Sequence, residues 1–169
     1  MNEAQIMETI RRESVLIDRA GLISLYGAVL RLAGLGIGGV LYQAGRQAGL
    51  RGAQLLHERL GLQGEELLEA ARIAFGAANW GQARWRREGS GISIEVEGSV
   101  LAEGLRPQKK PICHPLAGYI AGFLEIALQR PVRVRELTCA AVEGSICRFV
   151  AEIEGGEIVA NTRPPGHPG

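Results

Sequence analysis

Three cysteines carry most of the chemistry that this sequence could perform, and they fall at positions 113, 139 and 147. Three thiols cannot all form disulfides within one chain, and the sequence does not open with the charged, apolar and cleavable regions of a secretory signal. We therefore do not expect a secreted disulfide scaffold. Cys113 precedes a helix that can begin with Pro115, where unpaired backbone N–H groups favour a thiolate. Cys139 and Cys147 flank a predicted turn over residues 142–144, which would place the two sulfurs opposite each other.

A register problem in the hairpin around this turn adds Glu136 to the group. On the first strand, the apolar residues Val132 and Val134 share a face with Glu136 and not with Cys139, if side chains alternate strictly. On the second strand, Cys147 belongs to the apolar face. One extra residue between Glu136 and Cys139, a β-bulge, brings all of these side chains to one face. Glu136 is then carried inward, where an isolated carboxylate is costly.

An inward carboxylate beside three thiols predicts a tetrahedral zinc site with Cys113, Glu136, Cys139 and Cys147 as ligands. With four protein ligands and no position open for water, the zinc would be structural and would join the helix to the hairpin. Three other interpretations stay open. The cysteines could be buried free thiols with Glu136 at the surface, Cys139 and Cys147 could form a disulfide, or His114 could replace Glu136 as the fourth ligand.

The first hairpin can be assigned residue by residue. If a two-residue turn falls at positions 89–90, Trp85 faces Ile94 and Arg84 faces Glu95. Apolar pairs and charge pairs then separate onto the two faces. We therefore expect an antiparallel hairpin with Trp85 pointing inward.

Helical periodicity before and between two hairpins indicates the fold class. We expect an α+β fold in which an antiparallel meander sheet of two hairpins packs against several helices. A single ligand-binding domain over residues 14–155 would follow an N-terminal arm (1–13) and precede a disordered tail (156–169), whose end is too polar and proline-rich to build a core. Helices are expected over residues 22–32, 35–60, 65–75 and 115–129, a short strand over 14–18, and the second hairpin over 132–153.

Small residues recur on two of the predicted helices. Gly45, Gly49 and Ala53 are spaced by four, so they share one face and allow another backbone to approach closely, either within the chain or across a dimer. Each helical glycine costs about 0.5–1 kcal/mol relative to alanine, which tight packing would offset. Gly118 and Gly122 are interpreted as leaving space beside aromatic side chains.

The chain has only eight aromatic residues, so their positions are informative. Trp80 and Trp85, together with Tyr119 and Phe123 one helical turn apart, are predicted to line an apolar ligand cavity whose floor is the sheet. The alternative is that these four side chains belong to an ordinary core.

Composition and motifs exclude several function classes. A net charge of +1 gives no basis for contact with nucleic acid, and no apolar run reaches the length of a membrane span. The glycine pattern at residues 34–39 lacks the preceding strand that dinucleotide binding requires, and the sequence yields no serine or cysteine triad. We therefore expect a cytoplasmic protein that is not an enzyme.

Three segments resemble the 4-vinyl reductase domain family. They are CHPLAGYIAGFLE from Cys113, VRVRELTCAAVEGSICRFVAEI from Val132, and more loosely GGVLYQAGRQAG from Gly38. The family includes sensor domains of aromatic-compound-responsive transcription activators and proteins linked to bacteriochlorophyll synthesis, and its fold is similar to that of TRAPP vesicle-tethering subunits. The resemblance spans about residues 14–153. It implies zinc held by Cys113, Glu136, Cys139 and Cys147, a small aromatic effector between helices and sheet, and a homodimer formed through N-terminal helices.

The sequence thus favours a non-enzymatic domain that binds or senses a small apolar, aromatic or hydrocarbon molecule and contains a structural zinc. Two alternatives stand beside this hypothesis. One is a tetrapyrrole carrier or a vinyl reductase-related protein of pigment synthesis, as the family name implies. The other is a dimeric scaffold without a ligand, which a closed and filled interior would favour.

Overall fold

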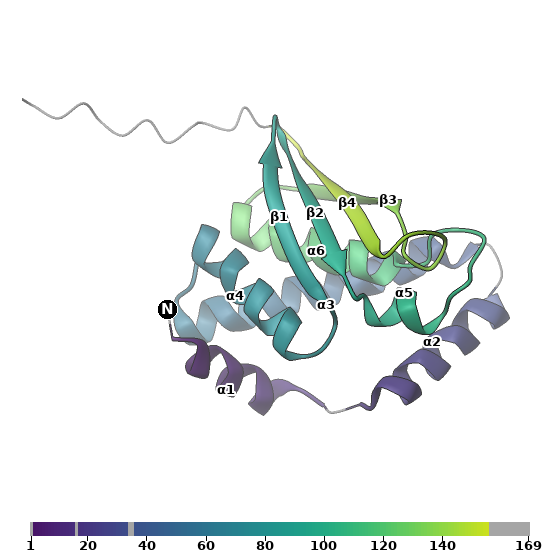
Figure 1. Cartoon of the computed structure of the whole chain (residues 1–169). Coiled ribbons are helices and arrows are strands. Elements are labelled where there is room, and N and C mark those ends of the chain that lie inside the picture. The colour runs from purple at the N-terminus through teal and green to yellow at the C-terminus, as the bar shows by residue number, and fades with distance from the viewer. Residues whose placement is uncertain (1, 16, 34–35, 156–169) are drawn as a thin grey trace, which may run out of the picture.

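A four-stranded antiparallel sheet with helices on one face forms the fold, so the chain is of the predicted α+β class (Figure 1). The computed structural model describes residues 2–15, 17–33 and 36–155. Within these ranges the elements are α1 (Glu3–Glu13), α2 (Arg19–Ala33), α3 (Gly38–Leu60), α4 (Gly64–Ala77), β1 (Gln82–Glu88), β2 (Gly91–Glu97), α5 (Val100–Gly104), α6 (His114–Leu128), β3 (Val132–Thr138) and β4 (Ile146–Ile153).

The four predicted helices are present as α2, α3, α4 and α6, with ends shifted by a few residues. Helices α1 and α5 were not predicted. The arm expected before the domain contains α1, and its Ile6 is 1% exposed within the core. The strand expected over residues 14–18 is wrong: its described residues form a loop, in which the Asp18 carboxylate accepts a hydrogen bond from the Gly21 backbone N–H at 2.8 Å and starts α2.

The first hairpin has the predicted register. Trp85 pairs with Ile94 and Arg84 pairs with Glu95, and Gly89 at the turn has a φ of 57°. Ile94 is buried and Trp85 half-buried, whereas Arg84 is exposed. The separation of apolar from charged pairs therefore identifies the face of this hairpin that packs against the helices.

The second hairpin contains the predicted β-bulge. Glu136 pairs with Phe149, but Thr138 pairs with Arg148, so the register shifts between Glu136 and Thr138. The loop is longer than expected, because β3 ends at Thr138 and β4 begins only at Ile146. Cys139 therefore lies just beyond the strand and reaches Cys147 from the loop, not as its partner in the ladder.

The two hairpins join through β2 and β4, so the strand order is β1-β2-β4-β3 and not the sequential order of a meander. Strand β4 suits the interior of the sheet because it has apolar side chains on both faces. Phe149 is buried on the inner face and Val150 is half-buried on the outer face. The edge strands instead carry exposed arginines, such as Arg86 in β1 and Arg133 in β3, which discourage pairing with further strands.

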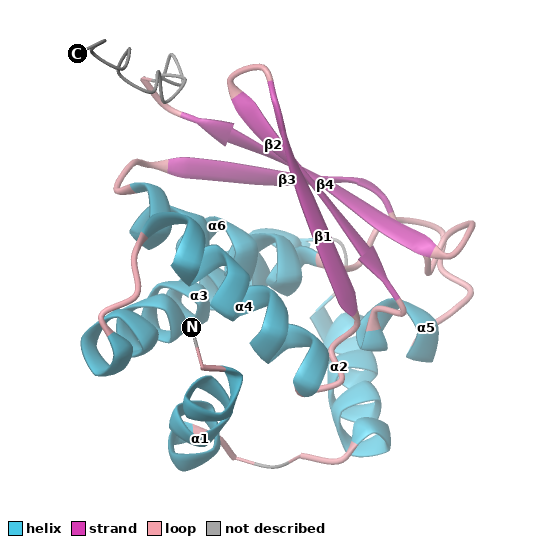
Figure 2. Ribbon diagram, turned by 60° about the vertical axis from the view of Figure 1, so that its left-hand side comes forward, coloured by secondary structure: helices cyan, strands magenta, loops and turns pink. Residues whose placement is uncertain are grey.

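Helices cover one face of the sheet, as Figure 2 shows, and the other face is charged. On the outer face, Arg148 pairs with Glu95 at 3.0 Å and Arg135 pairs with Glu152 at 2.7 Å. Surface pairs of this kind contribute about 0–1 kcal/mol each, so the inner face dominates the stability of the sheet. The apolar inner face is where any site between sheet and helices must lie.

Helices α3 and α6 are in direct backbone contact, which their glycines make possible. A Cβ atom on Gly45 or Gly49 of α3 would overlap backbone atoms of α6. A Cβ atom on Gly118 or Gly122 of α6 would overlap backbone atoms of α3. The predicted small-residue face of α3 is therefore used within the chain, and the interpretation of Gly118 and Gly122 as space for a cavity is wrong.

The predicted tail, residues 156–169, lies outside the described residues. Of the helices that the structure describes, none combines the length and the hydrophobicity needed to cross a bilayer.

The α3–α6 contact gives a first prediction. Replacing Gly49 or Gly118 with alanine inserts a methyl group where backbone atoms already meet, so the free energy of unfolding should fall by about 2 kcal/mol or more. Gly39→Ala is the matched control, because Gly39 lies in the first turn of α3 and a methyl group added there would have no atom within 4 Å. The control should be neutral or stabilising by up to about 1 kcal/mol.

Urea denaturation of the three variants tests this expectation. Equal stability of Gly49→Ala and Gly39→Ala would show that the two helices tolerate a wider spacing than the structure has.

Candidate functional site

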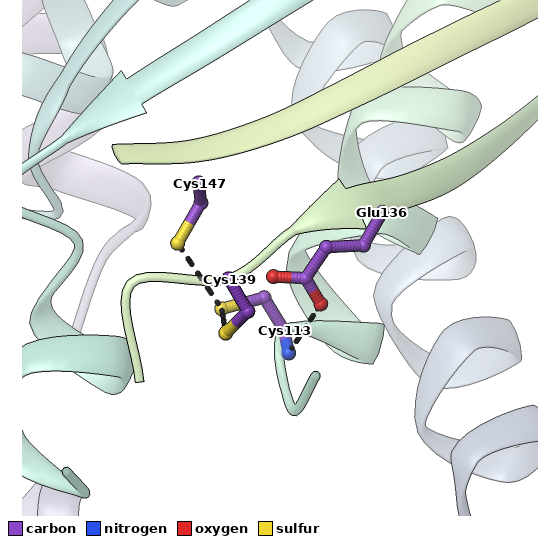
Figure 3. Close-up of side chains that lie close together, drawn as sticks. All are labelled: Cys113, Glu136, Cys139 and Cys147. Atoms are coloured by element: carbon purple, nitrogen blue, oxygen red, sulfur yellow. Dashed lines mark hydrogen bonds between the residues drawn. The ribbon is translucent and has the colours of Figure 1, made fainter. Parts of the chain in front are cut away.

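Cys113, Glu136, Cys139 and Cys147 come together at one end of the sheet, as Figure 3 shows. Cys113 is the N-cap of α6, Glu136 lies next to the bulge of β3, Cys139 follows β3, and Cys147 belongs to β4. One ligand atom from each residue lies within 4.8 Å of the other three. The four predicted metal ligands therefore lie together, supplied by the start of α6 and by both strands and the loop of the second hairpin.

The sulfur atoms are spaced as ligands of one ion would be. The Cys113 Sγ lies 3.9 Å from the Cys139 Sγ and 3.8 Å from the Cys147 Sγ. A tetrahedral ion with metal–sulfur bonds of about 2.3 Å separates its sulfurs by about 3.8 Å. All three cysteines are free thiols, so the alternative of a Cys139–Cys147 disulfide is not formed.

Glu136 occupies a position that leaves one of its oxygens without a partner. Its Oε2 accepts a hydrogen bond from the Cys113 backbone N–H at 3.0 Å, while its buried Oε1 has no hydrogen-bond partner among the described residues. Burial, together with the nearby Cys139 charge, raises the pKa of Glu136 to about 8. A buried acceptor without a donor is costly, and a cation bound at Oε1 would remove that cost.

The thiols share negative charge unevenly. Hydrogen bonds from the Cys113 and Cys147 thiols lower the pKa of Cys139, and the same interaction raises the pKa of Cys113. The Ala140 backbone N–H donates to the Cys147 Sγ at 3.4 Å. The cluster is therefore prepared to hold anionic sulfur, and its donor set of three thiols and one carboxylate fits a tetrahedral, borderline-soft divalent ion.

His114 is not part of the cluster. Its imidazole ring packs against Gly38 at the start of α3, although His114 is adjacent to Cys113 in the sequence. The geometry therefore favours Glu136 over His114 as the fourth ligand.

Two residues that the sequence analysis missed support the Cys113 segment. The phenol of Tyr26, in α2, donates a hydrogen bond to the Ile112 carbonyl oxygen, and burial raises the pKa of Tyr26. The buried Ser99 Oγ lies 4.0 Å from the Cys113 Sγ. No local pattern could have identified either residue, because each reaches Cys113 from a distant part of the chain.

Two apolar cavities flank α6. The sheet-side cavity, about 90 Å³, lies between α4, α6 and the inner face of β1 and β2, and Trp85, Tyr119 and Phe123 line it. The helix-side cavity, about 580 Å³, is lined by residues of α1 to α6, and Trp80, Tyr119 and Phe123 belong to its lining. The four predicted ligand-binding residues therefore divide between two cavities, with Tyr119 and Phe123 common to both.

The comparisons with known proteins agree with this fold. Residues 92–153 match the family model of the 4-vinyl reductase domain, which confirms the predicted family resemblance for that part of the chain. A comparison with curated protein sequences gives no significant match.

Three solved structures share the fold at low sequence identity. The phenol-responsive sensory domain of the transcription activator PoxR with phenol has 18% identity and a TM-score of 0.70, covering 83% of this chain and 76% of that one. A vinyl-4-reductase family protein from Methanocaldococcus jannaschii has 19% identity and a TM-score of 0.59, covering 90% and 88%. A trafficking protein particle complex subunit 3 from Naegleria fowleri covalently bound to palmitic acid has 16% identity and a TM-score of 0.63, covering 80% and 95%.

The raised pKa of Glu136 gives a prediction for metal titrations. Without metal, Glu136 holds a proton below about pH 8, and a metal ion must displace it. Affinity for zinc should therefore rise with pH between 6 and 8, in part because Glu136 loses its competing proton over this range. Glu136→Gln should weaken binding and should reduce the number of protons released by about one.

Calorimetry in buffers of different ionisation enthalpy measures the proton count. Glu152→Gln is the control, because Glu152 lies exposed on the outer face of the same hairpin. An unchanged proton count in Glu136→Gln would mean that Glu136 is not a ligand.

Proposed function

From this fold and its match to the 4-vinyl reductase domain, we propose that the chain is a non-enzymatic domain that binds or senses a small apolar or aromatic molecule, with a structural zinc ion beside the binding cavity. The observation that supports this proposal most directly is the sheet-side cavity, whose lining is almost entirely apolar and includes α6, the helix that begins at the metal cluster. PoxR's sensory domain, which has the same fold, is described with phenol.

Zinc is the proposed ion because the donors are thiols and a carboxylate at tetrahedral spacing. Four protein ligands leave no open position, so the role is structural. Three thiolates, one carboxylate and Zn²⁺ carry a net charge of about −2. Backbone N–H donors from Cys113 and Ala140, with the positive end of α6, offset part of it. Arg135 and Arg148, on the outer face of the same hairpin, pair with Glu152 and Glu95.

The sheet-side cavity suits a single ring. An apolar cavity of about 150 Å³ binds benzene, so a cavity of about 90 Å³ that is partly open to solvent can take one small ring after modest movement of its walls. A tetrapyrrole is far larger than the sheet-side cavity. Neither cavity has a histidine or cysteine in its lining as the structure describes it, so such a pigment would have no nitrogen or sulfur ligand for its metal.

The lining of the sheet-side cavity argues against catalysis. Its ionisable groups within the described chain are Arg72, which pairs with Glu69, and the Tyr119 phenol, whose pKa burial raises. No nucleophile stands next to a general base there, and general acid–base chemistry needs a group that titrates near the working pH.

Because two cavities are present, the filled interior that would favour a ligand-free scaffold is not observed.

The proposal includes a homodimer formed through the N-terminal helices. Leu25 and Leu32 lie seven residues apart on one face of α2 and are 60% and 88% exposed. Val40, at the start of α3, is 67% exposed. A second copy covering this face would bury these side chains.

Free thiols at the cluster fit a reducing compartment such as the cytoplasm.

Zinc removal provides the test of the structural role. Native mass spectrometry of the purified protein should find one zinc per chain and two chains per assembly. Cys147→Ser should lose the ion and lower the free energy of unfolding by at least about 3 kcal/mol, because the metal binding energy contributes to folding. A metal-free protein with undiminished stability would refute the zinc site.

Binding of an aromatic ring provides the test of the ligand site. In a Trp80→Phe variant, Trp85 is the single tryptophan, and titration with phenol or toluene should change its fluorescence saturably. Ala83→Phe fills the sheet-side cavity and should abolish the response, whereas Ala48→Phe, in the helix-side cavity, should preserve it. A response that persists in Ala83→Phe would place the ring elsewhere.

A further inference from the structure

The helix-side cavity is too large and too long to be explained by a one-ring ligand. Its volume of about 580 Å³ lies within the range of roughly 300–1,000 Å³ of small-molecule sites, and a cavity of only about 150 Å³ already holds benzene. The α3 residues in its lining run from Leu41 to Leu56, which is about 22 Å along the helix axis at 1.5 Å per residue. The shape calls for an elongated occupant.

Most of the surface of this cavity is apolar. Leucines from α2 and α3, alanines from α3 and α4, and aromatic rings from α4, α6 and the segment before β1 supply it. An apolar surface of this extent, open in part to water, is unfavourable unless something apolar covers it. The body of the occupant is therefore a hydrocarbon chain or an equally apolar frame.

Two polar groups belong to this lining at neighbouring positions along α3: the half-buried Tyr119 hydroxyl beside Gly52 and the exposed Arg51. The Tyr119 hydroxyl lies against Gly52 of α3, and no hydrogen-bond partner for it is found within residues 2–15, 17–33 and 36–155. Arg51 precedes Gly52, and no carboxylate of the described residues lies within ion-pair distance of its guanidinium. Glu13 also reaches the cavity, but it pairs with Arg59 at 3.4 Å. A cation and a hydroxyl without partners are complementary to an anionic oxygen.

We infer that the helix-side cavity is a second binding site, separate from the sheet-side cavity, for an elongated apolar molecule that ends in a carboxylate. The carboxylate accepts hydrogen bonds from Arg51 and from the Tyr119 hydroxyl, and the apolar chain lies along α3 toward Leu41. The ligand classes of the two cavities differ because only the helix-side cavity combines length with an available cation.

The two tryptophans of the chain allow binding at the two sites to be measured separately by fluorescence. Trp80 lines only the helix-side cavity and Trp85 only the sheet-side cavity. In the zinc-loaded full-length Trp85→Phe variant, Trp80 is the single tryptophan. Titration of this variant with dodecanoate, below its micellar concentration, should change the Trp80 fluorescence saturably with one dodecanoate per chain.

Variants then test the role of each group. In the same background, Arg51→Gln should weaken dodecanoate binding about tenfold and should leave binding of 1-dodecanol within about twofold, because the alcohol has no charge to pair with Arg51. Ala48→Phe fills the helix-side cavity and should abolish binding of both probes. Ala83→Phe, in the sheet-side cavity, is the matched control and should change neither.

The inference is overturned if dodecanoate binding is not saturable, if Arg51→Gln weakens both probes equally, or if Ala83→Phe and not Ala48→Phe blocks them. Its failure is distinguishable from failure of the proposed function. Aromatic binding reported by Trp85 would persist when the helix-side cavity proves closed, for example by a second copy of the chain.

Discussion

Backbone contact between α3 and α6 is the constraint on which the rest of the structure depends. Four glycines, two on each helix, let the two backbones touch, and any side chain at these positions would force the helices apart. One face of α6 is thereby fixed against α3, while its other face covers the sheet. The N-terminus of α6, where Cys113 lies, is consequently fixed relative to the second hairpin. The same helix forms a wall of both cavities, so its position decides the shape of each.

The proposed metal site would offset a cost that the bulge in β3 creates. The bulge brings Glu136 onto the apolar face, where one carboxylate oxygen accepts the Cys113 backbone N–H and the other has no donor among the described residues. Burial raises the pKa of Glu136, so without a cation this group is mostly neutral near pH 7, and its Oε1 has no partner among the described residues. A divalent ion bound by Cys113, Glu136, Cys139 and Cys147 would give this oxygen a partner, and the bulge and the three thiols would then act as one unit.

Local patterns were sufficient for the features that depend on neighbouring residues. The alternation of apolar and charged pairs predicted the register of the first hairpin, and the phase mismatch between Val134 and Cys139 located the bulge. Features set by distant packing could not be derived this way. The pairing of β2 with β4 joins strands from two different hairpins, and the choice of α6 as partner of the α3 glycines likewise depends on the tertiary arrangement. The four aromatic residues line cavities, as the sequence predicts, but their division between two cavities depends on the position of α6.

Tyr26 joins three features that would otherwise be independent. It belongs to α2, whose exposed leucines form the proposed dimer face; its ring lines the helix-side cavity; and its hydroxyl bonds the carbonyl of Ile112, the residue before Cys113. Moving α2 must therefore break this hydrogen bond inside a largely apolar environment or displace the segment that carries the first metal ligand. Breaking the hydrogen bond leaves a buried hydroxyl and a buried carbonyl unsatisfied. Displacing the segment instead moves Cys113 relative to Glu136, Cys139 and Cys147, because the α3–α6 contact holds α6 in place. The position of α2, the shape of the helix-side cavity and the geometry of the proposed metal site are thus coupled through one side chain.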